Sequence, residues 1–95
     1  MAETVDDLTV QYSEGGIDIV EELEKHVLSK GAWSTVMFKY REWDRRKEEY
    51  SAPKVSIRRY QKREGQFFQK SKFNISSEKQ AKEIISTLQN WFPES

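Results

Sequence analysis

Three segments between residues 32 and 75 alternate apolar and polar side chains with a period of two, and this alternation constrains the fold more than any other feature. The segments read AWSTVMFKYREW from Ala32, VSIRRYQK from Val55 and FFQKSKFNI from Phe67. Each is rich in β-branched and aromatic residues, so each is predicted to be a strand. Gly65 allows a tight turn that joins the second and third strands as a hairpin. The alternation therefore predicts an antiparallel sheet.

The two sides of these predicted strands differ in chemistry, because successive side chains point to opposite faces of a sheet. The apolar sides carry Val36, Phe38 and Tyr40 in the first strand, Val55 and Ile57 in the second, and Phe67, Phe73 and Ile75 in the third. The other sides combine cations with aromatic residues: Met37, Lys39, Arg41 and Trp43; then Arg58, Tyr60 and Lys62; then Phe68, Lys70 and Lys72. We expect the apolar sides to lie against a helix.

That helix is predicted near the C-terminus. Ser77, followed three residues later by Gln80, forms a capping box that starts it. One apolar stripe follows at helical spacing, and Pro93 ends the helix. The stripe comprises Ala81, Ile84, Ile85, Leu88, Trp91 and Phe92.

The N-terminal third is harder to interpret. Residues 17–30, IDIVEELEKHVLSK, fit helical spacing, and their propensity favours a helix, but part of the apolar pattern also fits a strand. Residues 1–16 are polar and acidic and end in Gly15-Gly16, so we interpret them as a disordered arm. Residues 17–95 then form a single domain.

The charges are balanced overall but unevenly distributed. The chain has 16 basic and 16 acidic residues, yet the first 30 residues hold eight acids against two lysines. The remaining residues carry the opposite excess, which is typical of an acidic segment beside a domain that binds polyanions. Much of the excess lies between Lys54 and Phe73, where seven cations accompany one acid, Glu64.

Residues for catalysis are scarce. The chain has no cysteine and one histidine, His26, so neither a thiolate nor a histidine-pair metal site is expected. No serine lies in a recognisable nucleophile motif. We expect no enzyme activity, no cofactor and no small-molecule substrate. The absence of a long apolar run argues against a membrane partner, and a cytoplasmic location, nucleoid association included, is expected.

Cations and aromatic rings on one face of a sheet suit a single-stranded nucleic acid. The cations contact phosphates, while the rings stack on bases whatever their sequence. We therefore predict non-sequence-specific binding of single-stranded DNA or RNA. The candidate binding residues are Lys39, Arg41, Trp43, Arg58, Tyr60, Lys62, Phe68, Lys70 and Lys72. The other two tryptophans, Trp33 and Trp91, are assigned to the core.

Four stretches of the sequence resemble one known family. VMFKYREWD, PKVSIRRYQKREG, KSKFNISSEKQAKEII and the earlier IVEELEKHVLSKGAW are similar to the homology region of the positive-cofactor-four family of transcriptional coactivators, including its small bacterial members. The resemblance covers about residues 17–92. It implies a curved four-stranded antiparallel sheet followed by one helix, in a homodimer that binds single-stranded DNA and has a transcription-related role. It also implies that residues 17–29 are a strand.

Some candidate residues match the family's motifs by position. Trp43 matches the aromatic that closes one strand, Arg58 and Tyr60 match an IR-Y motif, and Lys70 matches a basic position before the last strand. Two positions depart from the family. Gln61 stands where a second stacking aromatic is common, and Lys72 replaces a glycine.

Two alternatives remain open from the sequence. If residues 17–30 are helical, the order becomes α-β-β-β-α, as in double-stranded-RNA-binding domains. Alternatively, the basic and aromatic faces form a protein-interaction module for an acidic partner.

Overall fold

A six-stranded antiparallel sheet and one C-terminal helix make up the protein. The computed structural model describes residues 3–94. The elements are a 3-10 turn (Val5–Asp7), β1 (Tyr12–Glu14), β2 (Ile17–Ser29), β3 (Trp33–Asp44), β4 (Glu49–Tyr50), β5 (Lys54–Arg63), β6 (Gln66–Ile75) and α1 (Glu78–Trp91). The strand order is β1-β2-β3-β5-β6, and β4 pairs with β3. The prediction of an antiparallel sheet followed by a helix is confirmed, although two short strands accompany the four long ones.

The hairpin of β5 and β6 forms as predicted. Its two turn residues, Glu64 and Gly65, have φ angles of 50° and 79°. Two positive φ angles in a two-residue loop match the twist of the flanking strands, and glycine adopts them without strain.

Residues 17–29 form a strand, β2, so the order α-β-β-β-α is wrong for this chain. β2 pairs with β3 from Val20 to Ser29, and its register shifts twice. Each shift adds an unpaired residue and moves the following side chains to the other face, which explains why the apolar pattern of β2 breaks its period of two. Pairing with β3 outweighs the helix propensity of this segment.

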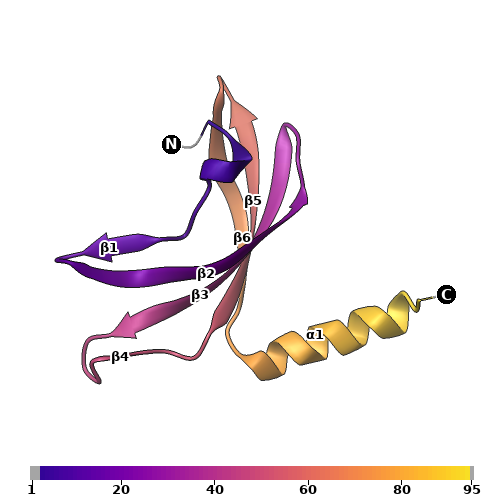
Figure 1. Cartoon of the computed structure of the whole chain (residues 1–95). Coiled ribbons are helices and arrows are strands. Elements are labelled where there is room, and N and C mark those ends of the chain that lie inside the picture. The colour runs from indigo at the N-terminus through magenta and orange to yellow at the C-terminus, as the bar shows by residue number, and fades with distance from the viewer. Residues whose placement is uncertain (1–2, 95) are drawn as a thin grey trace.

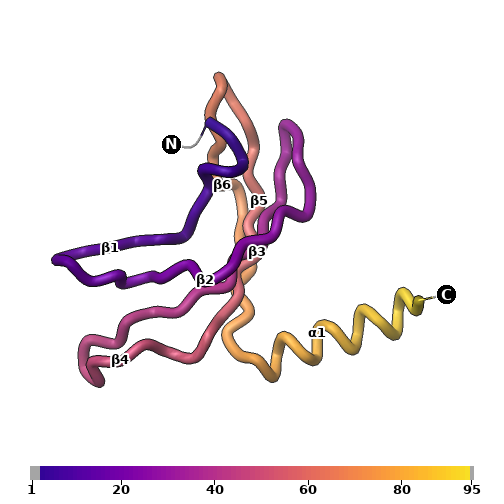
Figure 2. Tube along the Cα trace, in the orientation of Figure 1, coloured from indigo at the N-terminus to yellow at the C-terminus, as the bar shows by residue number. Residues whose placement is uncertain are grey.

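The sheet is curled, and the two sides of the curl are occupied differently (Figure 1). We call the hollow side, toward which Val36 and Phe38 point, the inner face, and the opposite side the outer face. The chain before β1 lies in the hollow, whereas α1 extends away on the other side. The tube in Figure 2 shows the same division, with β5 and β6 rising together as one limb of the curl.

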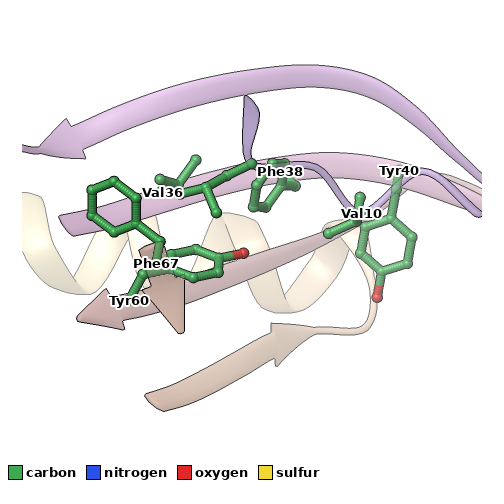
Figure 3. Packing of buried hydrophobic residues seen from close by; sticks show 7 residues of the cluster. Val10, Val36, Phe38, Tyr40, Tyr60 and Phe67 are labelled. Carbon is green, nitrogen blue, oxygen red and sulfur yellow. The ribbon is translucent and has the colours of Figure 1, made fainter. Parts of the chain in front are cut away.

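The core lies on the inner face (Figure 3). Val36 and Phe38 are completely buried. Around them pack Tyr40, Tyr60 and Phe67, which come from β3, β5 and β6. Full burial of an aliphatic or aromatic side chain stabilises a fold by about 1.5–3 kcal/mol, so this cluster is the main apolar contribution to the sheet.

Residues 4–10, which we call the N-terminal segment, complete the core by packing against the inner face. Leu8 and Val10 are buried against the cluster, and Val10 lies beside Phe38 and Tyr40 in Figure 3. The prediction of a disordered arm is therefore wrong for residues 3–16, while residues 1 and 2 of that arm lie outside the described range. Leu8 and Val10, with the partly buried Val5, dock the segment, because the curled sheet offers them an apolar hollow.

Strand registers also correct the predicted division into faces. Ser34 pairs with Tyr60 and Val36 with Arg58, so Arg58 and Tyr60 share the inner face with the core. Directly paired residues project to the same side of a sheet. The prediction that Tyr60 lies opposite the apolar side is wrong, because the side-chain period says nothing about how two strands align.

A register shift in β6 separates residues that the sequence pattern placed together. The shift lies opposite Arg59 and Tyr60. Before it, Phe67 pairs with Lys62 on the inner face; after it, Phe73 pairs with Ile57 on the outer face. The prediction that Phe67 and Phe73 share one face is wrong for this reason.

Helix α1 begins as predicted but covers little of the sheet. The backbone N–H of Gln80 donates to the Ser77 side chain at 3.1 Å, and the Gln80 side chain accepts from the Ser76 N–H. No residue of α1 is buried, and Leu88 and Trp91 are 47% and 67% exposed. The expectation that the helix covers the sheet is therefore wrong for this single chain, and so is the assignment of Trp91 to the core.

Candidate nucleic-acid interface

The β5–β6 hairpin carries an excess of positive charge that the rest of the described chain does not neutralise. Seven cations lie on it. Of these seven, only Lys54 forms an ion pair within residues 3–94. We call the other six the hairpin cations: Arg58, Arg59, Lys62, Arg63, Lys70 and Lys72. All except the half-buried Arg58 are exposed. Such a cluster attracts polyanions, because cations that no nearby carboxylate neutralises create a positive electrostatic potential at the surface.

The strand order explains this excess. β2 contributes four of the eight acids of the first 30 residues, and it lies beside β3, with two strands, β3 and β5, between it and β6. Lys39 pairs with Glu24 at 3.3 Å, and Arg41 pairs with Glu21 at 2.9 Å. The acids of β2 therefore neutralise the candidate residues Lys39 and Arg41 and leave the hairpin cations without partners. The uneven charge distribution along the sequence becomes a charge gradient across the sheet.

Lys54 at the start of β5 is the exception. Its ammonium group donates to Glu42 at 2.7 Å. This hydrogen bond, opposed by partial desolvation, raises the pKa of Lys54 above its ordinary value.

Three inner-face hairpin cations surround the edge of the core. Arg58 donates to Ser56 and to Gln69, both at 3.1 Å. Lys72 pairs with Arg58 across the strands, and the Lys62 ammonium lies 5.6 Å from the centre of the Phe67 ring. These cations therefore share a face with aromatic rings, but those rings are buried.

Tyr60 is 5% exposed and belongs to this core rather than to an open stacking surface. Burial raises the pKa of its hydroxyl, and the nearby Arg58 charge opposes that shift. Tyr60 was predicted to stack on bases, but its ring is not exposed while the N-terminal segment covers the core.

Two accessible aromatic rings lie on the outer face, Trp33 on β3 beside the hairpin and Phe68 on β6 within it. The Arg59 guanidinium lies 4.7 Å from the centre of the Trp33 ring, and Trp33 is 44% exposed. Phe68 is half-buried and lines a shallow hollow of about 370 Å³ at the hairpin tip with Arg63 and Lys70. Phe68, Arg63 and Lys70 therefore line one hollow, together with Glu64 and Gln69.

Trp33 is a candidate that the sequence analysis missed. It was assigned to the core, yet it pairs with Gln61 on the outer face. The alternation indicates this position, because Trp33 is an even number of residues from Lys39 and Arg41 and therefore points to the same face of the strand. Gln61, the position where the family resemblance is weakest, lies directly beside this tryptophan.

Trp43 forms a separate aromatic cluster at the far end of β3. Its ring meets the Tyr50 ring edge-on, with centres 5.0 Å apart and an interplanar angle of 69°. The Arg41 guanidinium lies 3.9 Å from the Tyr50 ring centre. Trp43 is half-buried, and both it and Arg41 contact Tyr50, away from the hairpin cations.

Comparisons with family models, with curated proteins and with solved structures give no match to this chain. Among the described residues, no helix is long and apolar enough to cross a membrane. Within the same range, no group of three His, Cys, Asp or Glu side chains could hold a metal ion.

Proposed function

We propose that the protein binds single-stranded DNA or RNA through the β5–β6 hairpin, with little preference for sequence. The observation that carries this proposal is that, within residues 3–94, none of the six hairpin cations pairs with a carboxylate, and that accessible rings lie beside them. A phosphate backbone supplies the missing negative charge, and its release of counterions drives binding.

The accessible rings support a single strand over a duplex. Bases of a single strand can stack on side chains, and each stacked base contributes about 1–3 kcal/mol. Trp33 of β3 and Phe68 of β6 both pair with Gln61 on the outer face, where Trp33 contacts Arg59 and Phe68 lines a hollow with Arg63. A duplex hides the faces of its bases, so it can use the cations but not the rings.

Fluorescence anisotropy tests this proposal directly. A labelled oligothymidine and a duplex of the same length are titrated with the full chain at low salt. We expect the single strand to bind more tightly than the duplex, and a Trp33→Ala variant to lose most of that difference. Equal or tighter binding of the duplex would contradict the stacking argument. No binding to either would leave the protein-interaction module as the better account.

We propose further that the protein is a homodimer joined through α1. The apolar stripe of α1 remains open: Ile85, Leu88, Trp91 and Phe92 are 54%, 47%, 67% and 76% exposed. On the same outer side of the sheet, Phe73 is 52% exposed beside Ile57. Contiguous exposed apolar surface is typical of an interface, and a chain of 95 residues gains stability from burying it.

Sedimentation equilibrium tests the dimer. A Leu88→Asp change places a charge in the stripe and is expected to give a monomer with an intact sheet. Lys82→Asp, on the same helix but outside the stripe, is the matched control and is expected to remain dimeric. A monomeric wild type, or a dimer that survives Leu88→Asp, would rule out this interface.

A further inference from the structure

The N-terminal segment is held on the inner face by side chains and not by strand pairing. Within the described residues, backbone pairing with β2 begins only at Tyr12. Residues 4–10 instead bond within themselves, where the N–H groups of Asp7 and Leu8 donate to the carbonyls of Thr4 and Val5. The segment can therefore leave the sheet without breaking a strand ladder.

One lysine of β2 provides most of the attachment. The Lys25 ammonium donates to the carbonyl oxygens of Val5, Asp6 and Leu8 at 2.8, 3.0 and 2.7 Å. All three protons of the ammonium group are thus used on the backbone of the segment.

A second attachment is made by Glu22, which lies three residues before Lys25 in β2. Glu22 accepts from the Thr9 hydroxyl at 2.6 Å and from the backbone N–H of Val10 at 3.3 Å. Both attachments are single side chains at the solvent edge of the core, so losing either one weakens the docking of the whole segment.

The surface beneath the segment has the composition of a stacking platform. Phe38, Tyr40, Tyr60 and Phe67 line the inner face. The same face carries Arg58, Lys62 and Lys72 from the hairpin. The Lys25 ammonium itself lies 6.0 Å from the centre of the Phe38 ring. Cations interleaved with rings are what a single strand requires.

The N-terminal segment has two properties that suit this surface, namely apolar side chains and negative charge. Leu8 and Val10 pack against the rings, and Asp6 and Asp7 give the same segment two negative charges. It therefore offers the inner face the same two interactions as a nucleic acid, apolar contact and negative charge.

We propose that the N-terminal segment is a displaceable cover, which competes with single-stranded nucleic acid for the inner face. This inference rests on the proposed function. When the segment is docked, a strand reaches only the outer face of the hairpin and the exposed ends of the inner cations. When it leaves, the rings and the Lys25 ammonium become available as well. The apparent affinity is then set by the fraction of molecules whose inner face is open.

Two variants of the full chain test the competition, with oligothymidine as the probe. Lys25→Met keeps the length of the side chain but removes the three charge-assisted hydrogen bonds. Although this change also removes a cation, we expect about tenfold tighter binding, because the open fraction rises. Lys30→Met, just beyond the end of β2, removes the same charge but takes no part in the attachment. We expect it to bind as the wild type does or slightly more weakly.

Thr9→Val is the second variant and changes no charge. It keeps the branched shape of the side chain and removes the hydrogen bond to Glu22, so we expect about threefold tighter binding. Circular dichroism and urea unfolding establish that each variant is folded. If Lys25→Met does not fold, Thr9→Val alone decides the comparison.

Amide hydrogen exchange of the wild type separates the possible failures. Binding of oligothymidine is expected to abolish protection of the Val10 amide. Oligothymidine binding with Val10 still protected, or with Lys25→Met and Thr9→Val no tighter than wild type, would overturn the competition and leave single-strand binding intact. No binding by any of the chains would overturn both proposals.

Discussion

The salt dependence of binding distinguishes a paired cation from an unpaired one on the same sheet. Lys70 and Lys39 are both exposed lysines of the sheet, but within residues 3–94 only Lys39 has a carboxylate partner, Glu24 at 3.3 Å. We therefore expect Lys70→Ala to reduce the dependence of affinity on salt, and Lys39→Ala to change it much less.

The magnitude follows from the number of free charges. Each phosphate contacted by a single-strand binder contributes about 0.7 to the slope of log affinity against log salt. The six hairpin cations set an upper limit of about 4 for this slope, which corresponds to roughly a 300-fold loss of affinity between 50 and 200 mM salt. Loss of one contact lowers the slope by about 0.7, or roughly threefold over that range.

Anisotropy titrations with oligothymidine at five salt concentrations measure this slope for the wild type and for both variants. Because both lysines are exposed, neither substitution removes a buried contact, and circular dichroism verifies the fold. Equal changes in slope for Lys70→Ala and Lys39→Ala would refute the argument from charge pairing. An unchanged slope for Lys70→Ala would exclude Lys70 from the interface.

Three further predictions concern the fold and its ionisation. Phe38→Ala removes a completely buried ring and should lower the free energy of unfolding in urea by about 3–5 kcal/mol; a loss below 1 kcal/mol would contradict its central place in the core. The pKa of Lys54 is raised, so its pair with Glu42 stabilises the fold fully below the ordinary lysine pKa. This contribution is lost as the pH rises through the folded-state pKa. Over that alkaline range the wild type should therefore lose more stability than Lys54→Met. Parallel pH profiles would show that the pair contributes nothing. Because burial raises the pKa of Tyr60, absorbance titration of the wild type should show a late-ionising tyrosinate component, and Tyr60→Phe should remove that component.

The strands and the helix start could be predicted from the sequence because they depend on local chemistry. The alternation in β3 and β5, the turn at Gly65 and the Ser77 cap each act within a few residues. β2 could not be predicted from its own residues, since its propensity favours a helix and it is a strand only because β3 pairs with it. The family resemblance supplied that strand.

The candidate site was only partly predictable, because it depends on how strands align. Period two places Arg58, Tyr60 and Lys62 on one side of β5, which is correct, but the pairing of Ser34 with Tyr60 makes that side the inner face. Likewise, the sequence shows cations on β3 and on the hairpin alike, and only the pairing of β2 with β3 shows which ones are neutralised. The docking of Leu8 and Val10 depends on the curl of the sheet, which no local pattern encodes.

The central claim is that a single strand contacts the β5–β6 hairpin. Amide chemical shifts of the full chain, followed by NMR during titration with oligothymidine, test it most directly. The account predicts that the largest changes fall between residues 58 and 72 and that they weaken as salt is added. Changes concentrated on α1 or around Trp43, with the hairpin unaffected, would contradict it.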